Sequence, residues 1–110
     1  MKWEVKYLPE VLEDLRRLDG SQRILVLKAI EKVRENPLPD TEGGYGKPLG
    51  SRNASNLSGF LKIKLRGAGL RIVYQLVRRD GEMLLIVIGA RADNEVYDTA
   101  QKRIRDKSQK

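Results

Sequence analysis

Three short segments at residues 60–66, 70–78 and 83–89, separated by glycine-containing turns, constrain the fold more than any other feature of the chain. In the first of them, LKIKLR, apolar and basic residues alternate with the period of two that places them on opposite faces of a strand. Gly67-Ala68 has the glycine-first composition of a two-residue turn, and Asp80-Gly81 is a strong hairpin signal. The sequence therefore predicts a three-stranded antiparallel meander.

The residues before the meander predict one strand followed by a helical hairpin. KWEVKYL alternates apolar and charged residues, which is typical of a half-buried strand. Apolar residues at helical spacing then run from Leu8 to Leu18, with a break expected at Asp19-Gly20. A second helix is expected from an N-cap at Ser21 to a stop at Asn36-Pro37. Four apolar residues are expected on its inner side: Ile24, Leu27, Ile30 and Val33.

The remaining segments complete an α+β fold. Residues 37–58 have no sustained period and are expected to form a long loop. A short C-terminal helix is expected after a cap at Asp93 or Asn94, with a frayed tail from residue 105. Residues 1–110 then form a single domain in which the N-terminal strand and helical hairpin pack on one side of an antiparallel sheet of about four strands. We expect the other side of the sheet to be free.

Composition removes several classes of function. The chain has no cysteine and no histidine, which excludes disulfides, thiolate nucleophiles, histidine-based triads and most zinc sites. The acidic residues form no evident metal site, because Asp93, Glu95 and Asp98 suit the start of a helix. The longest apolar run, Met83 to Ile88, is too short to cross a membrane, and no export signal opens the sequence. A cytoplasmic protein without membrane contact is therefore expected.

Positive charge is concentrated in the second half of the chain. The net charge is +7, and residues 59–79 carry cations and no acid. A concentrated positive field of this kind attracts phosphate backbones or an acidic protein. The alternative is a solvated basic surface that serves solubility. The cations here share the face of a strand, which favours a binding role.

The predicted hairpin brings three of these cations together. If Gly67-Ala68 is the turn, Lys64 faces Arg71 across two strands, and Lys62 lies beside them on the same face. Repulsion from its neighbours should lower the pKa of Lys64, so that this lysine could act as a general base. The same reasoning leaves open whether Arg91 lies on this face. Exposed cations elsewhere, Lys47, Arg52 and Arg66, are candidate RNA contacts or simple surface charges.

Several spaced motifs in residues 59–104 resemble the RelE branch of the RelE/ParE toxin superfamily. They are LKIKLR-x-x-G-x-R-I-V-Y-Q, a strand that ends in Gly-x-Arg, and EVY-x-x-A-x-x-R-I. The resemblance implies a toxin of a type II toxin–antitoxin pair that cleaves mRNA in the A site of the 30S ribosomal subunit without a metal or other cofactor. The 2′-hydroxyl would attack the adjacent phosphate and leave a 2′,3′-cyclic phosphate and a 5′-hydroxyl.

The resemblance also implies roles for five residues. Lys64 matches the base, and Lys62 and Arg71 match residues that hold the negative charge growing on the phosphate. Arg91 matches a residue that stabilises or protonates the leaving oxygen, of which we prefer stabilisation because a guanidinium barely releases a proton. Tyr97 matches a tyrosine that stacks on a base.

The superfamily contains a second activity, and its members have a protein partner. A ParE-type toxin would inhibit DNA gyrase by binding it, and a non-catalytic homologue would only bind RNA. The set of cations argues against gyrase inhibition. A cleavage assay distinguishes a nuclease from a homologue that only binds RNA. A cognate antitoxin is implied in any case and should be acidic. It would lie between the helical pair and the sheet, or displace the C-terminal helix near Tyr97.

Overall fold

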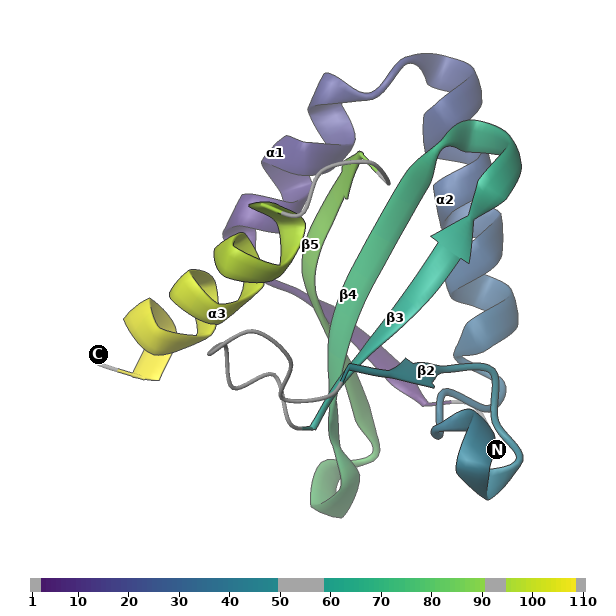
Figure 1. Ribbon diagram of the computed structural model, residues 1–110, viewed down its shortest axis with the longest axis vertical. Helices are drawn as coiled ribbons and strands as arrows, with labels where there is room; N and C mark the ends of the chain where they lie inside the picture. Colours follow the sequence, from purple (N-terminus) through teal and green to yellow (C-terminus); the bar gives the residue numbers. More distant parts are fainter. Residues whose placement is uncertain (1–2, 50–58, 91–94, 109–110) are drawn as a thin grey trace.

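The computed structural model describes residues 3–49, 59–90 and 95–108, which form the expected α+β fold (Figure 1). Five strands form one sheet in the order β1-β5-β4-β3-β2. The strands are β1 (Glu4–Tyr7), β2 (Lys47–Pro48), β3 (Phe60–Leu65), β4 (Leu70–Val77) and β5 (Glu82–Ala90). The helices are α1 (Pro9–Arg17), α2 (Gly20–Val33) and α3 (Glu95–Ser108). In these residues no helix is long and apolar enough to span a bilayer.

The meander of β3, β4 and β5 is confirmed, but its two turns are longer than expected. Each connection is a short 3-10 turn, Arg66–Ala68 or Arg78–Asp80, followed by a glycine. Gly69 and Gly81 have φ angles of 68° and 64°, a left-handed conformation that glycine adopts without a steric penalty. Lys64 still lies opposite Arg71, as the sequence predicted.

The register between β4 and β5 is set by the second turn together with a bulge. Val77 pairs with Glu82 at the turn, and the register shifts between Val73 and Tyr74. As a result Arg71 lies opposite Gly89 and not opposite Ala90, the partner that a two-residue turn would give it. Directly opposed residues of an antiparallel pair point to the same face, so Gly89 shares the face of Arg71.

The N-cap of the second helix of the hairpin lies two residues before the predicted one. Asp19, and not Ser21, is the N-cap of α2. Its carboxylate accepts a hydrogen bond of 2.8 Å from the backbone N–H of Gln22, whose side chain accepts one from the backbone of Asp19. Ser21 donates its hydroxyl to the same carboxylate. This capping box satisfies donors that the first helical turn cannot pair internally.

The inner face of α2 is only partly the one expected. Ile30 and Val33 are buried together with Val26. Ile24 and Leu27, which we expected to face inward, are 55% and 40% exposed. Residues 24–27 are apolar on all sides of the helix, so their spacing alone does not identify the side that packs on the sheet.

The second face of the sheet is not free, because α3 lies on it. Figure 1 shows α3 beginning beside β5 and lying in front of α1, with α2 behind β3 and β4. Val96 and Ala100 of α3 are buried, and the helix runs on to Ser108 instead of fraying from residue 105. The predicted cap at Asp93 or Asn94 lies outside the described residues.

Part of the expected loop adds an edge strand to the sheet. Residues 37–49 contain the 3-10 turn Asp40–Glu42 and then β2, which pairs antiparallel with β3. This segment is tied to the core by Tyr74, which is fully buried and donates its hydroxyl to the carbonyl of Pro37 at 2.7 Å. Burial strongly raises the pKa of the Tyr74 hydroxyl. Residues 50–58 lie outside the described part of the chain.

Candidate active site on the cationic face of the sheet

Basic side chains from three neighbouring strands share one face of the sheet, which we call the cationic face. Lys62 and Lys64 lie two residues apart on β3, and Arg71 lies opposite Lys64 on β4. Lys47 of β2 lies opposite Lys62. Lys62, Lys64 and Arg71 are partly buried, whereas Lys47 is exposed. The predicted group of three cations is therefore assembled, and Lys47 extends it to the edge of the sheet.

Tyr97 of α3 joins this group. Arg71 Nη1 donates a hydrogen bond to the Tyr97 hydroxyl. The guanidinium carbon of Arg71 lies 5.2 Å from the centre of the Tyr97 ring, and Lys62 Nζ lies 6.0 Å from it. At these distances the negative face of an aromatic ring attracts a cation. The tyrosine thus fixes two of the three cations and borders the site on the α3 side.

Arg71 retains a donor that nothing in the described part of the chain satisfies. Its Nε is buried and has no hydrogen-bond partner there. A guanidinium has five donors and no acceptor, and a buried donor without a partner is rare in proteins. An anionic oxygen is the natural acceptor for this group, because charge-assisted hydrogen bonds are the stronger ones. Together with the cations around it, this arrangement can bind an anion such as a phosphate.

The approach of α3 to this face depends on Gly89. A Cβ atom at this position would lie 2.7 Å from Val96 Cγ2, closer than carbon atoms can approach. The bulge in this pair of strands lies between Val73 and Tyr74 and not at this glycine. Glycine at position 89 allows the start of α3, and with it Tyr97, to reach the cations.

The other predicted site residues either lie at the margin of the cationic face or fall outside the described residues. Arg66 is exposed in the turn after β3. Arg91, matched to the leaving-group role, and Arg52 lie outside the described residues. Across residues 3–49, 59–90 and 95–108 there is no group of three or more carboxylates that could hold a metal ion.

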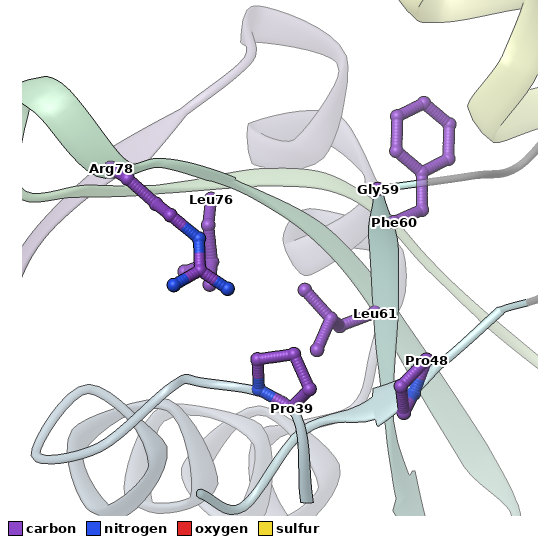
Figure 2. Close-up of a pocket in the computed structure, with 7 residues that line it drawn as sticks. All are labelled: Pro39, Pro48, Gly59, Phe60, Leu61, Leu76 and Arg78. Carbon is purple, nitrogen blue, oxygen red and sulfur yellow. The ribbon is translucent and has the colours of Figure 1, made fainter. Parts of the chain in front are cut away.

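A hollow of about 410 Å³ lies away from this site, at the ends of β3 and β4 remote from the Arg66–Ala68 turn (Figure 2). Its wall is mostly apolar. The guanidinium of Arg78 at its rim is held by Glu42 in two hydrogen bonds of 3.0 and 2.7 Å. Because this arginine is already neutralised, the hollow is a poor anion site. Its lining residues are Pro39, Pro48, Gly59, Phe60, Leu61, Leu76 and Arg78.

Comparisons with known proteins agree with this picture. No protein-family model matches the chain. The mRNA interferase toxin RelE of Escherichia coli K12 is 30% identical over 104 residues, which cover 94% of this chain and 99% of the relative. The chain belongs to the RelE toxin family.

Solved RelE structures have the same fold. A double mutant of the E. coli toxin RelE in the free state superposes with a TM-score of 0.74 at 29% identity, over 94% of this chain and 99% of that one. The same mutant bound to a peptide of the antitoxin RelB gives 0.67 at 27% identity, over 91% and 95% of the two chains. The resemblance found in residues 59–104 therefore extends over nearly the whole sequence.

Three features of this RelE-family site were not predicted from the sequence. Lys47 was a candidate contact only as an isolated charge, because β2 was not expected. The packing of α3 on the cationic face, and the role of Gly89 in it, were missed as well. One signal could have suggested the packing of α3 on this face. Gly89 and Tyr97 belong to two neighbouring motifs that are separated by one short connection.

Proposed function

We propose that the protein is the toxin of a type II toxin–antitoxin pair and an endoribonuclease that cleaves mRNA in the ribosomal A site. Family membership supports the toxin assignment, since similar proteins carry the name mRNA interferase. The observation that carries the nuclease assignment is the meeting of Lys62, Lys64, Arg71 and Tyr97 on one face, with a buried donor of Arg71 that no described residue satisfies.

The proposed reaction uses a nucleophile within the RNA. The 2′-hydroxyl oxygen forms a bond to the adjacent phosphorus while the bond from phosphorus to the 5′-oxygen breaks. The proton of the 2′-hydroxyl passes to the amine of Lys64, and the 5′-oxygen takes a proton from water and leaves as a hydroxyl. Lys64 must be neutral to accept this proton, and the positive charges beside it on the cationic face favour the neutral form.

The other site residues stabilise charge or hold the substrate. Lys62 and Arg71 face the phosphate and balance the negative charge that grows on its oxygens in the transition state. Arg91, one residue after the end of β5, is proposed to stabilise the leaving 5′-oxygen. Tyr97 is proposed to stack on a base of the mRNA. Lys47 and Arg66 are proposed to contact the RNA backbone farther from the reacting phosphate.

The proposed partners follow from this reaction and from the relatives. The substrate is mRNA on the 30S subunit, which would supply the substrate alignment that four or five side chains cannot. A cytoplasmic location is part of the proposal because translating ribosomes are there. A cognate antitoxin is proposed because a similar toxin has been solved with an antitoxin peptide. With a net charge of +7 on the toxin, an acidic antitoxin is expected.

Primer extension on transcripts from a cell-free translation reaction tests the proposal. Wild-type protein should cut within translated codons only when ribosomes are present. Lys64→Ala should abolish the cuts, because the variant keeps the fold but has no base. Lys28→Ala is the matched control, since Lys28 is an exposed lysine on α2 behind the sheet, and it should cut like the wild type.

Three results would contradict the assignment. Equal cutting by Lys64→Ala would remove this residue from the chemistry. Intact transcripts with wild-type protein, together with inhibition of DNA gyrase in a supercoiling assay, would assign the ParE-type activity instead. Salt-sensitive RNA binding without any cleavage would leave the cationic face as a binding surface only.

A further inference from the structure

A buried ion pair outside the cationic face links α1 to α3. Asp14 of α1 is 7% exposed and is the one buried charged residue among those that the structure describes. Arg103 of α3 donates two hydrogen bonds to this carboxylate, from Nη1 to Oδ2 at 2.7 Å and from Nη2 to Oδ1 at 3.1 Å. The family resemblance assigns neither residue a role. Burying a charged pair carries a high desolvation cost, so its retention calls for an explanation.

The ion pair also completes the edge of β5. Along this edge β1 pairs with β5 only from Glu82 to Leu85. Beyond that point the backbone N–H of Ile88 donates to Asp14 Oδ2 at 3.0 Å, and the carbonyl of Ile86 accepts from Arg103 Nη1 at 2.8 Å. The Asp14 carboxylate and the Arg103 guanidinium therefore supply the acceptor and the donor that a neighbouring strand would give to this part of β5. Both backbone groups belong to buried residues and need such partners.

Two of the three elements that the ion pair contacts, β5 and α3, border the site. β5 ends at Ala90, and α3 begins at Glu95 and carries Tyr97. Tyr97 and Arg103 lie six residues apart on α3, which is about 9 Å along a helix. The helix is thus held at two points: Tyr97 contacts the cationic face, and Arg103 contacts α1 and β5.

We propose that Asp14 and Arg103 are positioning residues, which hold α3 so that Tyr97 stays against Arg71 and Lys62. The role in activity rests on the nuclease proposed above, whereas the role in placing Tyr97 does not. In the described part of the chain the contacts of Asp14 and Arg103 are with each other and with β5, away from the cationic face, so their effect must act through the position of the helix. A displacement of about 1 Å in a substrate-positioning group can reduce a rate by about 100-fold.

The test compares the environment of Tyr97 with the rate of cleavage. Fluorotyrosine is incorporated into the protein, whose four tyrosines give separate 19F signals, and the signal missing from Tyr97→Phe assigns Tyr97. In Arg103→Met, which keeps an unbranched side chain about as long as the aliphatic part of arginine, the Tyr97 signal should move toward that of the exposed Tyr45. The kcat for ribosome-bound mRNA should fall about 10- to 100-fold while KM stays near the wild-type value.

Controls separate positioning from general damage. Arg103→Lys keeps a charge and a donor and should restore the Tyr97 signal and most of the rate. Arg105→Met changes an exposed arginine on the same helix and should leave both unchanged. If Arg103→Met does not fold, the double variant Asp14→Asn, Arg103→Met removes both charges and avoids a buried charge without its partner. It should show the same shift of the Tyr97 signal.

An unchanged Tyr97 signal in a folded Arg103→Met or double variant would overturn the proposal. Equal effects of Arg103→Met and Arg105→Met would do the same, because only the first contacts Asp14. If wild-type protein cleaves no mRNA, the proposed function fails, but the 19F signals still decide whether the ion pair places Tyr97.

Discussion

Replacing Gly89 with alanine tests how α3 is held on the cationic face. An added Cβ would lie 2.7 Å from Val96 Cγ2, whereas carbon atoms pack at about 3.5–4.0 Å. Val96 is 4% exposed and β-branched, so it has few other rotamers to adopt. The helix must therefore move away from β5 by about 1 Å. Overpacking of this size should lower the free energy of unfolding by about 1–3 kcal/mol.

Urea denaturation followed by circular dichroism measures this loss. Gly67→Ala is the matched control, because a Cβ at Gly67 meets nothing within 4 Å. The control should be neutral or stabilised by up to about 1 kcal/mol, since alanine restricts the unfolded chain more than glycine does. Gly89→Ala should also weaken the contact of Tyr97 with Arg71 and so reduce mRNA cleavage, whereas Gly67→Ala should not.

A double-mutant cycle with Val96→Ala tests the cause of the loss. Without the methyl groups of Val96, the next atom that an added Cβ would meet is Val96 Cβ, at an ordinary 4.0 Å. Val96→Ala alone should cost about 1.6 kcal/mol for two buried methyl groups. The double variant should be more stable than the sum of the single effects, by about 1–3 kcal/mol. Additive losses would refute the steric explanation.

Two further substitutions test the frame of the site. Tyr74→Phe leaves the buried carbonyl of Pro37 without its donor and should lower the free energy of unfolding by about 1–3 kcal/mol in urea. Because burial raises the pKa of Tyr74 in the folded state, its contribution is fully present below the unfolded tyrosine pKa of about 10 and is lost as pH rises above it. Wild type should therefore lose stability above that pH more steeply than Tyr74→Phe. Hydrogen bonds from Gln22 and then Ser21 lower the pKa of Asp19, so its contribution is present above the unfolded carboxyl pKa of about 4 and lost as pH falls through the lower folded value. Asp19→Ala should accordingly lower the Tm at pH 7 but flatten its decline in acid; equal declines in both proteins would exclude this role for the cap.

The sequence predicted the parts of this molecule that depend on local periodicity. The alternation in LKIKLR placed Lys62 and Lys64 on one face, and the hairpin placed Arg71 opposite Lys64. These predictions survived an error in the length of the turn, because the left-handed Gly69 changes the turn without changing the pairing before it. The helical hairpin was found for the same reason, although the capping residue was wrong.

What could not be predicted depends on contacts between distant residues. Asp14 read as one polar residue on a helix, yet it binds Arg103, 89 residues later in the chain. The packing of α3 on the cationic face depends on Gly89 and Val96 meeting, which no periodicity encodes. Ile24 and Leu27 were predicted to be buried because the sequence does not show whether another element covers an apolar side chain. Arg91, which the resemblance matches to the leaving-group role, lies outside the described residues, so its placement remains a prediction.

The pairing of β1 with β5 has a consequence for the order in which the chain folds during synthesis. Glu4 pairs with Glu82, so the first strand has no partner until almost the whole sheet has been translated. Such distant pairings have a high entropic cost of loop closure and fold slowly. The free edge beyond Leu85 is closed only when Arg103 follows, which at about 5–20 residues per second takes roughly one to four seconds more. A nascent chain therefore contains Lys62, Lys64 and Arg71 before it contains Tyr97. The candidate site is completed only after α3 has been synthesised and packed on the sheet.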